Sequence, residues 1–425
     1  MHHVLGWQCA VCGARVGLEH PTPWRCPNST ATDRHHVLQA TLTPAAARSA
    51  DPAGDAISSS HPFIRHDRRL AWSAAAAARG MTDAARAALV SELDAAVRDV
   101  DDVGFVATPF ERCDALSQAL GFDGGGGVWV KDETGGVGGS QKARHLFSIL
   151  LHLRSLELLG QLDTRPRLAI ASCGNAALAA ATLAKAADWP IDVFVPTWMA
   201  DGFARRLDEL GATTHRCERR AEDPAGDPAM LRFREAVDAG SVPFTVQGPE
   251  NALCLDGGRT IGWEIAECHH DGTALDAVFV QVGGGAFAGS VGAGLIEAGS
   301  AARLMAVQAA GCAPLDRAWQ LGATASDDWA TVMAPWPDPA SLADGILDDE
   351  TYDWIAVLEA IRATHGDSIV AAESNIVRAH ELAHEAGFDA SPTGTASLAG
   401  LLEVLEREPA WTQRRVAVII SGVTR

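Results

Sequence analysis

VWVKDETGGVGGSQKARHLFSILLHL, residues 128–153, is the stretch that decides the interpretation of this chain. Residues 128–130 are typical of a short strand, residues 134–139 form a glycine-rich loop, and residues 143–159 carry apolar side chains at helical spacing. Ser140 is predicted to cap this helix, which places Lys142 in its first turn.

Lysine is rare in this chain, and its rarity draws attention to Lys142. Only Lys131, Lys142 and Lys185 are lysines among the 34 basic residues, so the other 31 are arginine. A neutral lysine amine can form a Schiff base, whereas a guanidinium group stays charged. A lysine in a first helical turn is usually a solvated surface group, so its role depends on the rest of the chain.

The composition is that of a soluble globular protein with two or three domains. The chain has 425 residues, of which 47% are apolar and 21% charged. A net charge of -20 argues against nucleic acid or an anionic membrane as a partner. No apolar run reaches membrane-spanning length, and the first residues lack the features of a secretory signal. Nine scattered cysteines do not suggest a disulfide framework, so we expect a reducing, cytoplasmic location.

Residues 1–40 contain a candidate metal site. Cys9 and Cys12 form a Cys-x-x-Cys knuckle, and Cys26 follows after Trp24. Three thiolates at this spacing suit a tetrahedral Zn²⁺ ion in a segment too small to have its own core. A fourth cysteine near Ser29 is missing, so His35 or His36 is the candidate fourth ligand, and His20 is a weaker one. A knuckle that binds no metal is the alternative.

Strands and helices alternate from residue 128 to the C-terminus, after a linker predicted over residues 41–60. The strands are continuous apolar runs, which predicts an α/β fold with parallel sheets covered on both faces. We expect two doubly wound sheet domains. The larger comprises residues 61–135 and 240–425, and the smaller residues 136–239. Ligands bind at the carboxyl ends of such strands, where the glycine and Ser/Asn turns of this chain fall.

A glycine-rich turn links a strand to a helix and predicts a phosphate site; it consists of Gly283, Gly284, Gly285 and Ala286. Backbone N–H groups of such a turn, together with the helix N-terminus, bind an anion. A dinucleotide site is the rival, because Gly283-x-Gly285-x-x-Ala288 fits its loose fingerprint. That site requires an acid near Gln308 at the end of the next strand, and none is present. Tight packing of strand and helix is the structural alternative.

A second turn, Ser172-Cys173-Gly174-Asn175-Ala176, also links a strand to a helix. Its hydroxyl, amide and backbone donors could bind a carboxylate, although the turn could simply cap the helix. Ser421-Gly422 follows the last strand. A pyridoxal phosphate enzyme that acts on amino acids requires three features together: a glycine turn for the phosphate, a turn that binds the substrate carboxylate, and a lysine on a loop.

The chain resembles the fold-type II pyridoxal phosphate enzymes, the tryptophan synthase β-like fold that includes threonine synthase, threonine and serine dehydratases and cysteine synthase. Residues 139–144, GSQKAR, resemble the family's G-S-[FYH]-K-x-R motif, and residues 172–177, SCGNAA, resemble its S-[SAT]-G-N-[AHT] loop. The glycine turn and Ser421 match two further motifs in the correct order. The resemblance covers roughly residues 105–425, and the segment of residues 1–40 resembles the zinc-ribbon-like start of some threonine synthases.

The resemblance implies roles for these residues. Lys142 would be the Schiff-base lysine, and the loop from Ser172 to Ala176 would hold the substrate carboxylate. Asn175 would contact the 3′-oxygen of the cofactor, and Gly283–Ala286 its phosphate. Ser421 would face the pyridine nitrogen and leave it largely unprotonated, which suits elimination and replacement better than transamination.

The expected activity is β/γ-elimination or replacement on a small amino acid, of the threonine synthase type, in a homodimer. Serine/threonine dehydratase and cysteine synthase-like β-replacement are the alternatives within the family. A catalytically silent homologue that binds the cofactor or an amino acid is the alternative outside enzymes, and intact Lys142 argues against it. A nucleotide-dependent oxidoreductase is disfavoured by the missing acid near Gln308.

Two departures from the family pattern leave the substrate open. Gln141 replaces the usual aromatic residue before the lysine, and His145 stands where glycine is common. A phosphorylated substrate would need additional basic groups, for which Arg144, Arg205 and Arg206 are available. Cys173 could be reactive at a helix N-terminus, but packing is its expected role.

Overall fold

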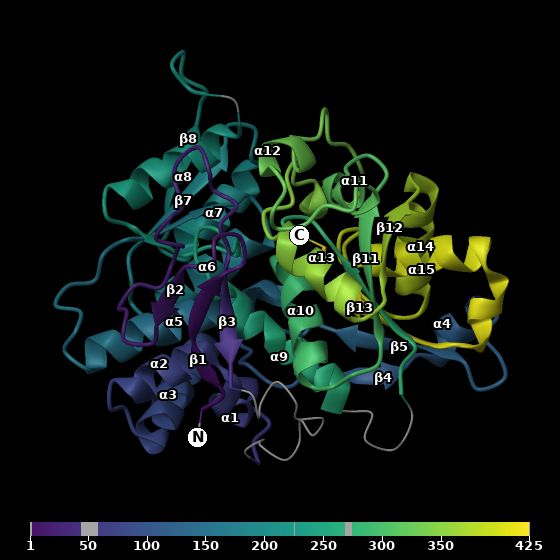
Figure 1. Ribbon diagram of the computed structural model, residues 1–425, viewed down its shortest axis with the longest axis horizontal. Helices are drawn as coiled ribbons and strands as arrows, with labels where there is room; N and C mark the ends of the chain where they lie inside the picture. The colour runs from purple at the N-terminus through teal and green to yellow at the C-terminus, as the bar shows by residue number, and fades with distance from the viewer. Residues whose placement is uncertain (1, 44–57, 225, 268–273, 425) are drawn as a thin grey trace.

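The computed structural model describes residues 2–43, 58–224, 226–267 and 274–424 (Figure 1). The predicted linker over residues 41–60 lies largely at positions 44–57, outside the described residues. Within the described ranges, no helix has the length and apolar character needed to cross a membrane.

The largest sheet has six strands in the order β12-β11-β10-β13-β5-β4. Its central strand, β10, is buried along its whole length, as its apolar sequence predicts. The strands are parallel, as expected, except that β4 runs antiparallel to β5 at one edge. The strands are β4 (Phe110–Arg112), β5 (Gly127–Asp132), β10 (Ala277–Gln281), β11 (Arg303–Ala309), β12 (Asp367–Ala371) and β13 (Arg415–Ile420).

Helices cover both faces of this sheet, because successive side chains of each strand point to opposite faces. Val278 and Val280 of β10 pack in one apolar core, while Phe279 packs in the other. The first face is covered by α9 (Cys254–Glu267), α10 (Ala286–Glu297), α11 (Pro314–Gln320) and α13 (Trp354–Ala363). The second face is covered by α4 (Asp114–Ala119), α14 (Glu373–Glu385) and α15 (Ala396–Arg407).

A second parallel sheet has the order β8-β7-β6-β9. Its strands are β6 (Leu168–Ala171), β7 (Ile191–Pro196), β8 (Thr213–Cys217) and β9 (Val242–Pro243). The core on one face includes α5 (Lys142–Leu158) and α6 (Asn175–Ala186), and α8 (Pro228–Asp238) packs on the other face. The remaining helices around this sheet are α1 (Pro62–Arg65), α2 (Ala71–Ala78), α3 (Asp83–Asp101) and α7 (Asp201–Glu209).

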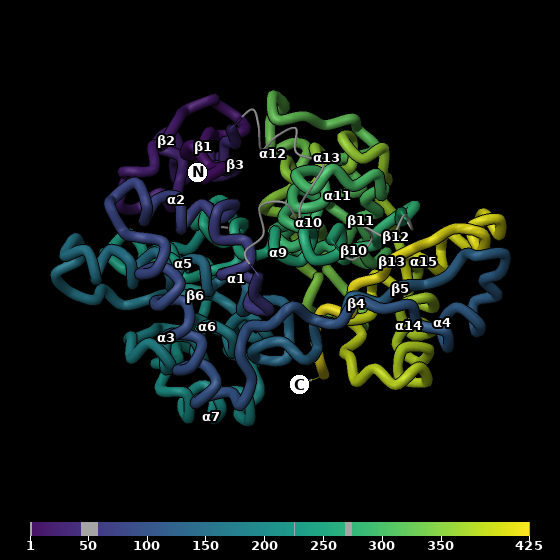
Figure 2. Tube along the Cα trace, turned by 90° about the horizontal axis from the view of Figure 1, so that it is seen from below, coloured from purple at the N-terminus to yellow at the C-terminus, as the bar shows by residue number. Residues whose placement is uncertain are grey.

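The N-terminal segment forms a small antiparallel sheet of three strands, in the order β2-β1-β3. These strands are β1 (Val4–Cys9), β2 (Arg15–Gly17) and β3 (Leu38–Leu42). Figure 2 shows this sheet beside α2 at one end of the molecule, close to α12 (Trp329–Val332) and α13 of the other half. Its buried residues share one apolar core with α2 and α5.

Helix α5 is held against α9 by a close backbone approach. A Cβ atom at Gly257 of α9 would lie 1.9 Å from the backbone oxygen of Arg144, so only glycine fits there. This contact fixes the helix that begins at Lys142 relative to the large sheet.

Candidate active site

Lys142 is the first residue of α5 and follows the glycine loop after β5. The helix cap differs from our prediction: Gln141 is the N-cap residue, and no side chain caps the helix. Ser140 is instead extended, and its backbone forms an isolated bridge with Gly422, the residue after Ser421. The pairing with the last strand takes Ser140 out of the capping position.

The predicted loops meet at this point of the fold. The backbone N–H of Gln141 donates to the carbonyl of Ser421 at 3.1 Å. A Cβ atom placed on Gly422 would lie 2.8 Å from Nδ2 of Asn175. The structure therefore brings the Lys142 loop, the loop that precedes α6 and the end of β13 into contact.

The glycine turn before α10 is crowded by residues 346–353. A Cβ atom on Gly283 would lie 2.6 Å from Oδ2 of Asp348, and one on Gly285 would lie 2.9 Å from Thr351. Gly285 also has φ +94°, the left-handed conformation that favours glycine. The N–H of Gly284 donates to the Asp348 carboxylate, so this turn already holds one anionic group of the chain.

Lys142 and Asp348 form the charged part of the site. Burial lowers the pKa of Lys142, and the nearby Asp348 acts in the opposite direction. Burial also raises the pKa of Asp348 to about 6, against the effect of the Lys142 charge. Among the described residues, Lys142 has no hydrogen-bond or ion-pair partner. An amine with a lowered pKa is neutral at lower pH than an exposed lysine, which a nucleophile or base requires.

Arg144 is not a free cation at the site. Its Nε lies 3.0 Å from Oε2 of Glu133, and its Nη1 lies 2.5 Å from Oε1 of Glu264 and 3.0 Å from Oγ1 of Thr260. All these groups are buried. Arg144 is thus committed to a structural network and is not available for a substrate phosphate.

The loop before α6 has the geometry of a helix N-terminus. Gly174 is the N-cap residue, and Oγ of Ser172 accepts from the Gly174 N–H at 3.3 Å. Asn175 is the first helical residue. Burial raises the pKa of Cys173, with a further contribution from Asp227, so its thiol stays protonated at neutral pH.

His145 lies one turn along α5 from Lys142. Its Nδ1 is 2.7 Å from the carbonyl of Cys254, which can only accept, so Nδ1 carries the proton. Burial and the Lys142 charge lower the pKa of His145 to about 3, so the ring is neutral. Its side chain also fills the space beside Gly258 of α9.

Pyridoxal phosphate fits this set of residues. The site contains an amine that forms no ion pair with the described residues, the N-termini of α6 and α10, and a hydroxyl group at Ser421. Oγ of Ser140 and Oε1 of Gln141 are buried and have no hydrogen-bond partner within the described ranges. Buried polar atoms are normally satisfied, so these two indicate that a polar group belongs beside them.

The predicted metal ligands of the N-terminal segment come together. Ligand atoms of Cys9, Cys12, Cys26 and His36 all lie within 4.8 Å of one another. Nδ1 of His36 is 3.4 Å from Sγ of Cys9, and Nε2 is 3.0 Å from Oδ2 of Asp33. Three thiols and an imidazole oriented by a carboxylate match a structural Zn²⁺ site.

His35 points away from this cluster, towards the segment that crowds the glycine turn. Its Nε2 lies 3.2 Å from Oε2 of Glu350, and its ring stacks on Trp329 with centroids 4.4 Å apart. His20 is not in the cluster either. Of the two histidines proposed as fourth ligand, His36 lies in the cluster, whereas His35 contacts the segment that carries Asp348.

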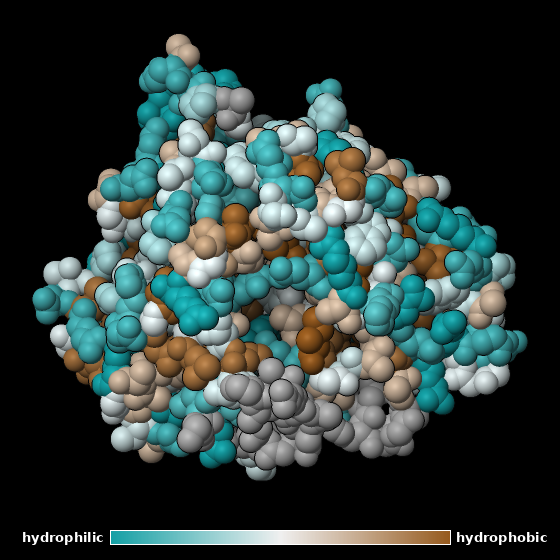
Figure 3. All heavy atoms as spheres, viewed as in Figure 1, coloured by the Kyte–Doolittle hydropathy of each residue, from teal (hydrophilic) through white to brown (hydrophobic). Residues whose placement is uncertain are grey.

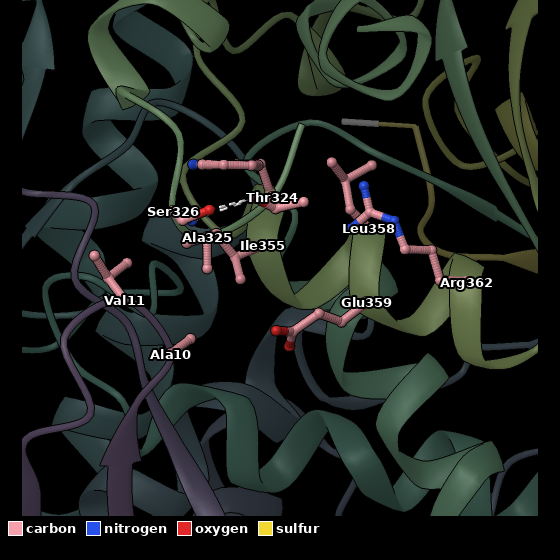
Figure 4. Close-up of a pocket in the computed structure, with 10 residues that line it drawn as sticks. Ala10, Val11, Thr324, Ala325, Ser326, Ile355, Leu358, Glu359 and Arg362 are labelled. Atoms are coloured by element: carbon pink, nitrogen blue, oxygen red, sulfur yellow. Dashed lines mark hydrogen bonds between the residues drawn. The ribbon is translucent and has the colours of Figure 1, made fainter. Parts of the chain in front are cut away.

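Two cavities lie away from Lys142. One, of about 330 Å³, lies between Ala10 and Val11 on one side and α13 on the other. Figure 4 shows Glu359 and Arg362 on that helix, and the hydrogen bond between Thr324 and Ser326 on a neighbouring segment. The other, of about 230 Å³, lies between the N-terminal sheet and helices α9, α10 and α13. Figure 3 shows a hollow edged by hydrophobic residues on the face that these elements form. Neither cavity is lined by the predicted site residues.

Sequence reasoning missed two side chains at the site, Asp348 and Gln281. Asp348 lies in an acidic run whose place in the fold no local pattern predicts. Gln281 is the last residue of the otherwise apolar strand β10 and lies two residues before Gly283. Its Nε2 donates to Oγ of Ser421 at 2.6 Å. A buried polar residue at that position is a signal that could have been used.

Comparisons with known proteins agree with this geometry. Residues 103–422 match the family model described as "Pyridoxal-phosphate dependent enzyme". A threonine synthase of Synechocystis sp. is 30% identical over 251 residues, which cover 56% of this chain and 59% of that protein. The chain thus matches only about three fifths of that relative's length.

Solved structures share the fold at low sequence identity. Threonine deaminase isoform 2 of Solanum lycopersicum has a TM-score of 0.61 at 19% identity, covering 81% of this chain and 86% of that one. Maize serine racemase has a TM-score of 0.58 at 18% identity, covering 78% and 92%. Diaminopropionate ammonia lyase of Escherichia coli has a TM-score of 0.61 at 17% identity, covering 80% and 88%. Because the family model spans most of the sequence, this chain belongs to the pyridoxal-phosphate-dependent enzymes.

Proposed function

We propose that this protein catalyses elimination or replacement at the β- or γ-carbon of a small amino acid whose side chain is not phosphorylated. The observation that carries the proposal is the state of Lys142: it is partly buried, its pKa is lowered by burial despite the nearby Asp348, and it forms no ion pair or hydrogen bond with the described residues. It begins a helix at the meeting point of the loops that the family uses for its cofactor.

Each of these loops has a role towards the cofactor. Lys142 would bind the aldehyde, and Asn175 and Ser421 would contact the ring. The turn Gly283–Ala286 would bind the phosphate in place of the Asp348 carboxylate, which accepts from the Gly284 N–H in this structure. The cofactor, when bound, supplies an electron sink beside the α-carbon of the substrate. The N–H groups before α6, with Ser172, would hold the substrate carboxylate. Once the substrate amine has taken its place on the aldehyde, Nζ of Lys142 would accept the α-proton, because its lowered pKa leaves more of the amine neutral than in an exposed lysine.

The charge around the site favours a side chain without phosphate. Asp349 and Asp227 both act to raise the pKa of Asp348, and Asp344 and Asp348 act in the same direction on Cys173. Arg144, the basic residue nearest in sequence to Lys142, is committed to Glu133 and Glu264. With the cofactor phosphate on the glycine turn, a second dianionic group would meet like charge from the phosphate and from these acids, whereas a hydroxyl or amino group would not.

Threonine synthase-type replacement remains the second candidate, because the sequence match to the Synechocystis threonine synthase favours it. The two candidates are separated by assaying ammonia, 2-oxo acid and phosphate release from a panel of amino acids. The panel contains serine, homoserine, threonine and 2,3-diaminopropionate, with phosphoserine and phosphohomoserine as the phosphorylated counterparts of the first two. We expect turnover of the unphosphorylated compounds. Preferential release of phosphate would contradict the charge argument and support the second candidate.

We also propose that Cys9, Cys12, Cys26 and His36 bind a structural Zn²⁺ ion. We expect about one zinc per purified chain and loss of most of it in Cys26→Ser. Cys217→Ser is the matched control, because Cys217 is also a buried thiol but lies in the second sheet. Equal zinc content in both variants would contradict the assignment.

A further inference from the structure

Gln281 is a buried polar residue at the end of the central strand of the large sheet. It is 3% exposed and lies two residues before Gly283, where the glycine turn begins. Its Nε2 lies 2.6 Å from Oγ of Ser421. The same nitrogen lies 3.0 Å from the carbonyl oxygen of Gly394, 3.2 Å from that of Thr393 and 3.3 Å from that of Ile419.

The three carbonyl groups fix the orientation of this amide. Carbonyl oxygens can only accept hydrogen bonds, so the atom that faces them must be the amide nitrogen. A flipped amide would place its oxygen against three carbonyl oxygens and leave its NH₂ group away from them. The observed orientation holds although Oε1 is buried without a partner among the described residues.

The orientation of Gln281 determines what the Ser421 hydroxyl can do. An amide NH₂ group cannot accept a hydrogen bond, so Oγ of Ser421 must be the acceptor in this contact. The hydroxyl proton of Ser421 is then free for another acceptor, and the described residues show no hydrogen bond that it donates. Ser421 lies beside Gln141 and the Ser140–Gly422 bridge, within the candidate active site.

We propose that Gln281 is a positioning residue that keeps the Ser421 hydroxyl as a hydrogen-bond donor towards the ring nitrogen of the cofactor. The inference rests on the proposed function, in which Ser421 faces that nitrogen. A serine alone does not determine the protonation of its partner, because a hydroxyl can donate or accept. With Gln281 donating to one of its two lone pairs, Ser421 keeps its proton for another acceptor, which matches the lone pair of an unprotonated ring nitrogen better than an N–H group. An unprotonated ring withdraws electrons less strongly, so Gln281 favours elimination over reactions that need the stronger electron sink.

The test is the ¹⁵N NMR resonance of the ring nitrogen in protein loaded with ¹⁵N-labelled pyridoxal phosphate. In the wild type at neutral pH we expect the resonance of an unprotonated, hydrogen-bonded pyridine. In Gln281→Met the resonance should move, because Ser421 becomes free to donate to a backbone carbonyl instead. In a Ser421→Ala background, Gln281→Met should cause no further movement, since the two residues act through one contact.

Gln308→Met is the matched control. Gln308 is also a buried glutamine near the end of a strand of the same sheet, but its Oε1 accepts from the backbone N–H of Leu315 at 2.8 Å. It makes no contact with Ser421, so its loss should lower stability without moving the resonance.

Three results would overturn the proposal: a protonated ring nitrogen in the wild type, an unmoved resonance in Gln281→Met, or the same movement in Gln308→Met. The wild-type measurement stands even if Gln281→Met does not fold. Protein that binds no labelled cofactor would overturn the proposed function as well, whereas bound cofactor with any of these three results would overturn only the role of Gln281.

Discussion

Lys131 and Lys142 are eleven residues apart in the sequence, but only Lys131 forms an ion pair with the described residues. Lys131 is fully buried, and its Nζ lies 2.5 Å from Oε2 of Glu264 and 2.7 Å from the carbonyl of Thr108. Lys142 has no such partner among the described residues, and burial lowers its pKa. A buried lysine with an acid partner keeps its charge and holds the fold together. A buried lysine without one tends to lose its proton and gains reactivity.

The largest expected effect that separates the two lysines is on activity. Lys142→Met removes the proposed base, so kcat should fall by at least about 10²–10⁴-fold. Lys185→Met, at the helix surface, is the control for the loss of a lysine as such and should retain activity. Steady-state kinetics on the best substrate of the panel measures kcat of both variants. Wild-type activity in Lys142→Met would contradict the assignment of Lys142 as the base.

The second effect is on stability. Lys131→Met leaves Glu264 with Arg144 alone, and breaking a buried ion pair costs about 3–5 kcal/mol. Denaturant unfolding of the apoprotein measures this loss. The surface pair Arg378–Glu406, more than half exposed on both sides, provides the comparison, since Arg378→Ala should cost less than about 1 kcal/mol. Equal losses would show that the network is not structural.

The network also predicts how stability depends on pH. Although burial opposes it, Arg144 and Lys131 lower the pKa of Glu264 to about 2. A carboxyl with a lowered pKa contributes stability above its unfolded value of about 4.3, and loses it as pH falls towards 2. Wild-type unfolding followed between these limits should show this loss, and Lys131→Met should show a shallower one. Parallel curves would contradict the assignment.

The smallest effect has the opposite sign. Lys142→Met should raise the stability of the apoprotein, because the charged amine is disfavoured in the folded state. The gain should be largest below the folded pKa of Lys142. It should disappear as pH rises to the unfolded value of about 10.4, where the lysine is neutral in both states. The same replacement would therefore stabilise at one position and destabilise at the other. A loss of stability at position 142 would contradict this.

The sequence predicted much of this arrangement because its signals are local. The apolar run of β10 and the helical spacing after Lys142 each depend on a few neighbouring residues, and both elements are found. The Cys-x-x-Cys knuckle likewise predicted where a cluster of potential metal ligands lies. Helix α13 and strand β12 follow residues 313–350, which contain several Pro, Trp and Asp and show no clear period, and these two elements were not predicted.

What the sequence could not show depends on contacts between distant segments. Ser140 does not cap α5 because it pairs with Gly422, nearly three hundred residues away. Arg144 was expected to be available for a substrate, but Glu264 of α9 binds it. The position of Asp348 on the glycine turn, likewise, follows only from the packing of residues 346–353.

The most direct test of the central claim is to identify which lysine reacts with the cofactor. The apoprotein is mixed with pyridoxal phosphate, the bond to the amine is reduced with borohydride, and the modified peptide is mapped by mass spectrometry. Our account predicts a single pyridoxyl group on Lys142 and none on Lys131. Modification of Lys131 or Lys185 in place of Lys142, or no modification, would contradict it.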